Sequence, residues 1–334
     1  MAVTIKDIAR HVGVTPTTVS MVVRGDSRIS AATREKVQLA IKEMKYRPNY
    51  IGRSLVKGKS NIIAVVSGYF SSMFAVEIMR GIESTLIPSE IKLNQYSTRG
   101  MKDKAPEIFR ELLYGVKPHS VISISIKPDD EVLSEFREEG IQLIMIEEAA
   151  EGFPSVRVDN IKGAFSAVDY LVKKGMTKIG IVSGSLSAAN DGGMCHERFR
   201  GYCDALTMHG ISYNPERLLE VADYSFEDGV EAVNRILKRS VKFDSLFCAA
   251  GDMTAAGVIR QLQEKGINVP SDMAVVGYDD IIISSVLRPS LTTVHQPIFE
   301  MGRTAIDMAL EHINKKPASG PRVFTPKLVI RESA

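Results

Sequence analysis

A run of small and hydroxyl-bearing residues lies close to the N-terminus, from Thr15 to Met21. Gly13 precedes the run, and glycine tolerates the left-handed backbone that a tight turn between two helices often needs. Thr15 followed by Pro16 is typical of a helix start, because threonine can cap the helix and proline suits its first turn. A helix that starts there would expose near its N-terminus Thr15, Pro16, Thr17, Thr18, Ser20 and Met21. In a helix-turn-helix, side chains at that end of the second helix contact base edges in the major groove of DNA.

A preceding helix would position this second one. Apolar residues recur at helical spacing from Ile5 onward, and Thr4 with Asp7 three residues later can cap that helix. The small side chain of Ala9 would let the helices approach, and Val19 would fill the angle between them. The pattern predicts a helix-turn-helix, and the alternative is a small helical hairpin in another kind of domain.

The charge distribution favours the first of these interpretations. Residues 1–60 contain twelve basic and four acidic side chains, a net charge of +8, whereas the whole chain carries +2. The remaining residues, 61–334, therefore carry −6. A basic end on an acidic body is typical of phosphate contact confined to that end. A merely solvated basic face would not explain why the excess coincides with the predicted helix-turn-helix.

A third helix would complete the N-terminal unit. Ser30 can cap a helix over 31–45, and its Val37 and Ile41 would face the first two helices. Pro48 forces the residue before it out of the helical region, so this helix ends near Tyr46. The core of such a headpiece is small, so we expect only marginal stability on its own.

A short basic segment over 50–60 follows the headpiece. It is too short for a helix with its own core, and Gly52 lowers helix propensity by about 1 kcal/mol relative to alanine. Leu55 lies among basic residues and could wedge into a minor groove while the cations hold phosphates. The alternative is a flexible linker whose leucine packs on the neighbouring domain.

From Asn61 onward, short apolar runs alternate with amphipathic helical stretches. The expected strands are 62–66, 91–96, 120–125, 142–146, 178–183, 244–249 and 273–278. The expected helices are about 74–86, 103–114, 130–139, 160–174, 194–209, 226–238 and 252–265. Continuous apolar strands that alternate with helices predict parallel sheets covered on both faces.

The number of strand–helix units is too large for one compact open sheet, so we expect two similar α/β subdomains. The irregular segment 155–160 falls between the two groups, and the chain is expected to return to the first subdomain at 291–297, before a helix over 298–314. The expected boundaries are 1–47 for the headpiece, 48–60 for the linker and 61–334 for the core; within the core, about 61–158 with 292–320 form the N-subdomain and about 159–291 with 321–334 form the C-subdomain.

Side chains that follow the strands predict a ligand site. Ligands of doubly wound sheets bind at the carboxyl ends of the strands, and a cleft between two such sheets is the expected position. Polar, charged or aromatic residues at these ends are Tyr69, Phe74, Glu147, Arg198 and Asp252. For each residue alone, a structural cap or a surface charge is an alternative; their common placement favours a ligand cleft.

Catalytic and metal-binding motifs are absent from the sequence. It contains no GxSxG, HExxH, CxxC, GxxxxGK[ST] or GxGxxG. Its six histidines are scattered, and Cys195, Cys203 and Cys248 lack metal-ligand spacing. We therefore expect no enzyme activity, no metal and no cofactor. There is no apolar run of about 18 residues and no secretory signal, so we expect a cytoplasmic protein that makes no membrane contact.

The whole chain resembles the lactose-repressor/galactose-repressor family of bacterial transcription regulators. The motifs that carry the resemblance are IKDIARHVGVTPTTVS, VVRGDSRISAATREKV, YRPN, RSL, RGIE, VRVDN, ERFRGY, VVGYDD and LTTVHQP, in matching order and spacing. The resemblance implies a helical headpiece and a core of two subdomains of the periplasmic-binding-protein type. It also implies a homodimer that binds a near-palindromic operator on the nucleoid, and a small effector in the cleft that shifts DNA affinity.

The resemblance assigns roles to individual residues. Pro16, Thr17 and Met21 take base-reading positions, with Thr18, Ser20, Arg24 and Asn49 near phosphates and Leu55 as the minor-groove wedge. The effector positions are Met73, Phe74, Glu147, Arg198, Tyr224, Asp252 and Gln296. Arg198 and Asp252 suit a ligand with hydroxyl groups, as a forked donor and an acceptor.

Several residues depart from the family pattern. Glu147 replaces the usual aspartate after the fourth strand, and Met73 and Phe74 lie in a segment that differs from the usual Asp-x-x-Asn-Pro-Phe-Phe. These changes argue against a plain hexose as the effector. Because no leucine heptads follow the last strand, we expect a dimer rather than a tetramer.

The sequence leaves other functions to be weighed. A solute-binding protein without a DNA function would not need the basic headpiece, and an enzyme of the same fold would need a catalytic constellation. Control by a protein partner instead of a metabolite remains an alternative within the regulator interpretation.

Overall fold

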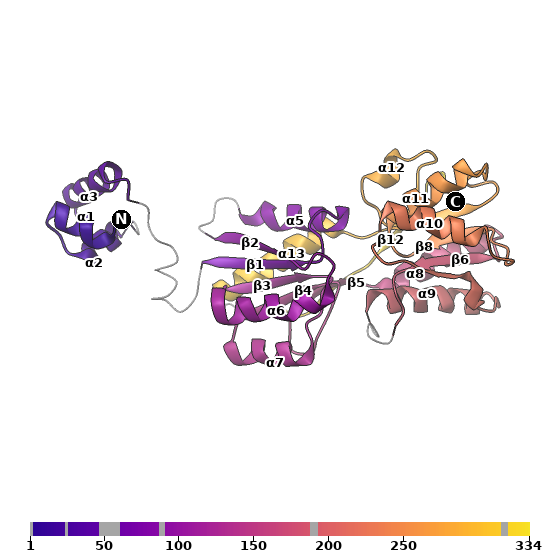
Figure 1. Ribbon diagram of the computed structural model, residues 1–334, viewed down its shortest axis with the longest axis horizontal. Helices are drawn as coiled ribbons and strands as arrows, with labels where there is room; N and C mark the ends of the chain where they lie inside the picture. Colours follow the sequence, from indigo (N-terminus) through magenta and orange to yellow (C-terminus); the bar gives the residue numbers. More distant parts are fainter. Residues whose placement is uncertain (1–2, 24–25, 47–60, 87–90, 188–192, 315–319) are drawn as a thin grey trace. The chain divides into compact units, whose positions relative to one another are not determined.

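The computed structural model describes residues 3–23, 26–46, 61–86, 91–187, 193–314 and 320–334 (Figure 1). The chain divides into two compact units, residues 1–60 and 61–334. The predicted linker, 48–60, lies outside the described residues.

The first unit contains the three predicted helices, α1 (Ile5–Val12), α2 (Pro16–Val23) and α3 (Ala31–Glu43). Thr4 and Asp7 form a reciprocal capping box at the start of α1, which confirms that prediction. Gly13 ends α1 with φ 76° in the left-handed region. The Thr15 hydroxyl accepts a hydrogen bond of 3.1 Å from the Thr18 backbone N–H, so Thr15 caps α2 as expected.

The headpiece core lies where the three helices meet. Ile8, Val19 and Val37 are completely buried and come from α1, α2 and α3 respectively. Tyr46, beyond the end of α3, is also buried and joins this core, which the sequence analysis did not predict. Ile41, expected inside, is partly buried against the same cluster.

The second unit contains two mainly parallel sheets. The strand order of the first sheet is β11-β5-β4-β3-β1-β2 and that of the second is β12-β10-β9-β8-β6-β7. The first sheet consists of β1 (Ile62–Ser67), β2 (Lys92–Ser97), β3 (Ser120–Ile124), β4 (Gln142–Ile146), β5 (Ser155–Val158) and β11 (Arg322–Phe324). The second consists of β6 (Ile179–Ser183), β7 (Leu218–Glu220), β8 (Ser245–Cys248), β9 (Ala274–Asp279), β10 (Thr292–His295) and β12 (Lys327–Val329). Strand β12 pairs antiparallel with β10, whereas the other pairings are parallel.

Helices cover both faces of each sheet, so the predicted doubly wound architecture is confirmed (Figure 1). The helices against the first sheet are α5 (Met73–Leu86), α6 (Ala105–Arg110), α7 (Asp130–Glu139) and α13 (Ile298–Ile313). Those of the second subdomain are α8 (Asn160–Lys173), α9 (Met194–Met208), α10 (Phe226–Ile236), α11 (Asp252–Glu264) and α12 (Ile283–Val286). A π-helical turn, Glu111–Val116, continues α6, and 3-10 turns cover Lys102–Lys104 and Pro215–Arg217.

The side chains of alternate residues in a strand point to opposite faces of the sheet. In β1, Ile63 and Val65 pack with α5 and α13, while Ala64 and Val66 pack with α6 and α7. Because both faces are buried, the strands read as continuous apolar runs rather than as alternating ones.

The first crossing between the subdomains follows residue 158, the predicted boundary, whereas the two later crossings differ from the predicted ones by a few residues. Segment 155–158 is a regular strand of the first sheet, not an irregular connection. Strand β10 pairs with β9 in the second sheet, so residues 292–295 do not belong to the N-subdomain, and the return crossing follows His295. Strand β11 pairs with β5, so residues 322–324 belong to the first sheet. Among the helices that the structure describes, none has the length and apolar composition needed to cross a bilayer.

Candidate DNA-binding helix and effector cleft

The N-terminal turn of α2 presents the predicted DNA-contacting side chains. Thr15, Pro16 and Thr17 are exposed, whereas Thr18 and Met21 are half-buried. Ser20 is also half-buried. The hydroxyls of Thr15 and Thr18 lie 2.9 Å apart and share a hydrogen bond within the cap, in which the exposed Thr17 takes no part. Arg24, Asn49 and Leu55 lie outside the described residues.

The other two helices of the first unit carry exposed cations. Lys6 and Arg10 lie on α1 and Lys36 and Lys42 on α3, and all four are exposed. Arg28 is held by Asp26, with its Nη2 donating at 2.7 Å, and the backbone oxygen of the same aspartate accepts from Arg34. The first unit thus combines exposed cations, the kind of side chain that contacts phosphates, with an uncharged start of α2; its contact with bases stays a prediction.

Arg198 on α9 is the centre of a buried polar cluster in the second unit. The side chain is only 2% exposed. Its Nε donates to Oδ1 of Asn160 at 2.9 Å, and its Nη1 donates to the Ala249 carbonyl at 2.7 Å. The guanidinium also lies over the ring of Tyr278, 3.7 Å from the ring centre. These contacts fix the guanidinium and direct its remaining nitrogen, Nη2, at Glu147.

Glu147 meets Arg198 from the opposite subdomain. It directly follows β4, and its carboxylate lies 3.5 Å from Nη2 of Arg198 and accepts a short hydrogen bond from the Ser125 hydroxyl. Its backbone is left-handed, with φ 69°, which is costly for a residue with a Cβ. Burial raises the pKa of Glu147, and the charge of Arg198 and the Ser125 hydrogen bond oppose that rise.

Tyr224 and Cys195 lie close enough to Arg198 and Glu147 for both charges to affect their pKa values. The Tyr224 hydroxyl and the Cys195 sulfur are 3.2 Å apart. Burial is the main cause of the raised pKa of both groups; the charge of Glu147 adds to each rise and the charge of Arg198 opposes it. A Cβ at Gly184 would overlap the Tyr224 hydroxyl, so the glycine lets this ring lie against the end of β6. The structure thus brings Tyr224 together with Glu147 and Arg198, as the sequence analysis expected.

Asp252 has a different environment from the one expected. Its side chain is fully buried at the start of α11. It accepts hydrogen bonds from the Ile281 backbone N–H at 3.0 Å, the Ser284 hydroxyl at 2.6 Å and the Thr293 hydroxyl at 2.6 Å. The carboxylate therefore ties α11 to the 281–284 turn and to β10, and its direct contact with an effector stays a prediction.

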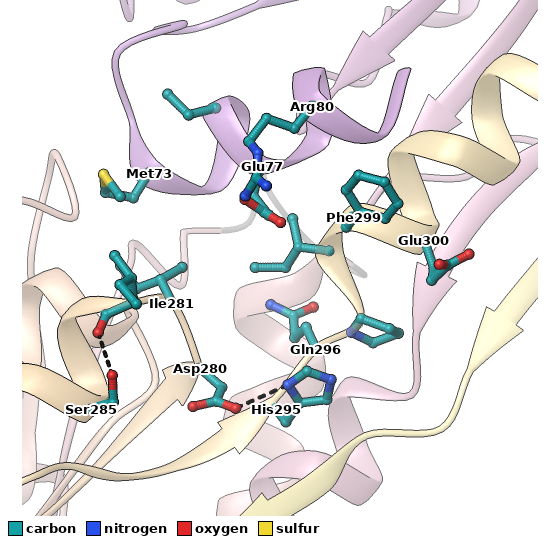
Figure 2. Close-up of a pocket in the computed structure, with 14 residues that line it drawn as sticks. Met73, Glu77, Arg80, Asp280, Ile281, Ser285, His295, Gln296, Phe299 and Glu300 are labelled. Atoms are coloured by element: carbon teal, nitrogen blue, oxygen red, sulfur yellow. Dashed lines mark hydrogen bonds and ion pairs between the residues drawn. The ribbon is translucent and has the colours of Figure 1, made fainter. Parts of the chain in front are cut away.

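A pocket of about 650 Å³ lies between α5 and the segments 280–285 and 295–300 (Figure 2). It contains two of the predicted effector residues, Met73 and Gln296, while Glu147, Arg198, Tyr224 and Asp252 do not line it. Gln296 connects it to the cluster, because its amide donates to Oδ1 of Asp279 at 2.6 Å and Asp279 interacts electrostatically with Arg198. Phe74 packs against the hydrophobic core of the first sheet instead of lining this pocket.

Several residues of the buried polar cluster were missed by the sequence analysis. Asp279 ends β9, and burial raises its pKa to about 8. Ser125 follows β3, and Asn160 begins α8 and bonds to Arg198. Asp279 lies in the VVGYDD motif and at a strand end. The search for polar side chains at strand ends, which found Glu147, could therefore also have found Asp279. No signal in the sequence marks the contacts of Asn160. In the part of the chain that the structure describes, no cluster of histidine, cysteine and acidic side chains could hold a metal ion.

Comparisons with known proteins agree with this architecture. Residues 4–49 match the bacterial regulatory proteins of the lacI family, and residues 168–334 match the periplasmic binding protein-like domain. Catabolite control protein A of Priestia megaterium is 31% identical over 100% of this chain and 99% of its own length.

Two solved structures are also similar. The lac repressor dimer bound to operator and the anti-inducer ONPF is 26% identical, with a TM-score of 0.85 over 100% of this chain and 99% of that one. The transcriptional regulator CelR in complex with cellobiose is 28% identical, with a TM-score of 0.72 over 99% of this chain and 100% of that one. With an N-terminal helix-turn-helix that is followed in the sequence by a two-subdomain core of the periplasmic-binding-protein type, the chain belongs to the lacI family of DNA-binding transcriptional regulators.

Proposed function

We propose that this chain represses transcription by binding a near-palindromic operator as a homodimer, and that a small metabolite in the cleft changes its affinity for DNA. The observation that carries the proposal is the pairing of a capped recognition helix, α2, with a buried cluster of directed charges at the strand ends of the core. A regulator of this kind acts on the chromosome, in the cytoplasm of a bacterium.

The cluster suits an effector with hydroxyl groups. Arg198 offers Nη2 as a donor, while Glu147 and Asp279 offer carboxylates that accept hydrogen bonds from hydroxyls. Glu148 adds a further carboxyl group whose pKa burial raises to about 7, so these side chains offer hydrogen-bonding groups more than negative charge. The relative CelR was solved with a disaccharide, cellobiose, which supports a neutral polyol or glycoside as the ligand class.

The surface beside the pocket suits a second copy of the chain. Val76 is 38% exposed and Ile282 68%, and both line the pocket together with Met73 and Arg80. Exposed apolar side chains gathered round one pocket are typical of a surface that another protein covers. The two-fold symmetry of an operator matches a dimer formed in this way.

A promoter–reporter assay in a bacterial host tests the function. The wild-type chain is expected to lower expression from a promoter that carries its operator, and one member of a panel of neutral sugars and glycosides is expected to change that repression at least about tenfold. Arg198→Lys should keep repression but weaken the response, because lysine cannot donate in the same fork. Unchanged expression with and without the protein would contradict the proposed function.

A further inference from the structure

Arginine side chains cover the outer edge of β7 in the second sheet. Among the strands that the structure describes, β7 (Leu218–Glu220) is the last in the order of that sheet and pairs with β6 alone. A strand at the edge of a sheet leaves a row of backbone N–H and C=O groups to which a strand of another chain can bond. The groups that cover this row decide whether the edge can take up a further strand.

The pairing of β7 with β6 shows which of its backbone groups point outward. Ser183 of β6 pairs with Glu220, and the Ser183 carbonyl accepts from the Val221 N–H at 2.9 Å. Adjacent residues of a strand direct their N–H and C=O groups to opposite sides, so Leu219 and Val221 face β6. The carbonyl groups of Leu218 and Glu220 therefore point away from the sheet.

Both outward carbonyls accept hydrogen bonds from arginine. Nη1 of Arg235, in the last turn of α10, donates to the Glu220 carbonyl at 2.8 Å. Nη1 of Arg239 donates to the Leu218 carbonyl at 3.1 Å and also to the carbonyl of Glu216. The N–H of Leu218 is bonded within the preceding 3-10 turn. A further strand would have to break these bonds before it could pair with β7.

The spacing of the two arginines matches the spacing of the carbonyls. Four residues of a helix span about 6 Å, and two residues of a parallel strand span about 6.6 Å. After α10 the chain continues as a helical turn, because the Arg239 N–H donates to the Ile236 carbonyl at 3.0 Å. Arg235 and Arg239 therefore lie on the same side of this segment, at about the repeat that the donors of a neighbouring strand would have.

Both arginines also keep their positive charge at the edge. Within the residues that the structure describes, neither forms an ion pair with a carboxylate. Two copies of the chain that joined through their β7 edges would bring four guanidinium groups together, and like charges across paired strands are destabilising. The edge is thus both occupied by hydrogen-bond donors and protected by charge.

We propose that Arg235 and Arg239 close the β7 edge to strand addition, and that a second copy of the chain pairs with this edge when they are removed. The partner is a second copy because two identical edges can pair antiparallel about a two-fold axis. The closed edge confines the assembly of the core to its other surfaces, and it does so whether or not the chain binds DNA.

Sedimentation of the full-length protein over a range of concentrations tests the proposal. Arg235→Met combined with Arg239→Met keeps two long side chains but removes their charges and donors. The double variant is expected to form species larger than the wild-type protein at concentrations at least about tenfold lower than the wild-type chain requires. Amide exchange in the segment 218–221 should slow as these species form, because strand pairing protects those N–H groups. A peptide with the sequence of residues 216–222 should reverse the association, whereas the same peptide N-methylated at alternate residues should not.

Arg260→Met is the matched control. Arg260 is also a helix arginine, but it pairs with Glu264 of its own helix at 2.8 Å, and its variant should sediment as the wild-type protein does. The single variant Arg235→Met leaves both bonds of Arg239 in place and should show a smaller shift in the same direction, so it keeps the test if the double variant does not fold. Unchanged sedimentation of the single and double variants would overturn the proposal. Association without slower exchange at 218–221, or equal association of the Arg260→Met control, would overturn it as well.

Discussion

At the scale of single residues, the cleft gathers carboxyl groups that burial keeps from ionising easily. Burial raises the pKa of Glu148 to about 7, and the nearby charge of Glu147 adds to the rise. A carboxyl group whose pKa is higher in the folded state binds a proton more tightly there than in the unfolded chain. Its contribution to stability is therefore complete at low pH and is lost as the pH rises from its ordinary pKa through about 7.

Glu148→Gln should flatten the dependence of stability on pH. The free energy of unfolding of the wild-type protein should fall between pH 5 and pH 8, and the variant should recover about 1–3 kcal/mol of that loss. Thermal unfolding across this range measures the effect, with the exposed Glu107→Gln on α6 as the control. Parallel curves for the variant and the wild-type protein would show that Glu148 does not bind a proton in this range.

The sequence predicts which residues of the cluster come together but not the individual contacts that they make. Glu147, Arg198 and Tyr224 could be placed in one cluster because strand ends of parallel sheets converge. The hydrogen bonds of Asp252 could not be predicted, since Ser284 and Thr293 lie 32 and 41 residues further along the chain. The strained backbone of Glu147 is likewise set by its neighbours in space and not by its own propensity.

At the scale of elements, closely crossing helix pairs support the sheets. Helices α5 and α13 pack through Gly81 and Gly302. A Cβ at Gly302 would overlap the carbonyl oxygen of Ile78, and one at Gly81 would lie 2.9 Å from the backbone nitrogen of Arg303. Since backbone atoms cannot yield as a side chain can, these glycines fix the distance between the two helices.

Gly302→Ala should therefore destabilise the core by about 1–3 kcal/mol, because the added methyl group forces the helices apart. The free energy of unfolding in urea measures the loss. Gly115→Ala is the control, because its nearest neighbour would be a side-chain carbon of Glu111 at 3.9 Å. Equal stability of the two variants would contradict close backbone packing between α5 and α13.

Most helix ends could be predicted at this scale because capping residues mark them, as Thr4, Ser30 and Ser225 do. The strands β7, β11 and β12 were missed because each spans three residues, too few for a periodic pattern. The sheet to which β10 belongs could not be predicted either, since an apolar strand shows its burial but not its neighbours.

At the scale of the whole molecule, the proposed dimer is expected to form through the surface beside the pocket. Ile282→Asp would place a charge at an apolar position that is 68% exposed in the single chain. The variant should remain folded and dissociate to monomers at concentrations about a hundredfold higher than the wild-type protein does. Analytical ultracentrifugation measures this, with Leu39→Asp in the first unit, 52% exposed, as the control. A monomeric wild-type protein, or an unchanged dimer in the variant, would contradict the proposal that this surface forms the dimer interface.

The proposed function depends above all on sequence-specific DNA binding. The most direct test is selection of binding sites from a randomised DNA pool by the purified full-length protein, followed by sequencing. We predict a symmetric enriched site, and we predict that exchanging Thr17 and Met21 for alanine changes the preferred bases in both half-sites while the core stays folded. No enriched site at low salt, with the panel of sugars and glycosides added, would contradict the central claim.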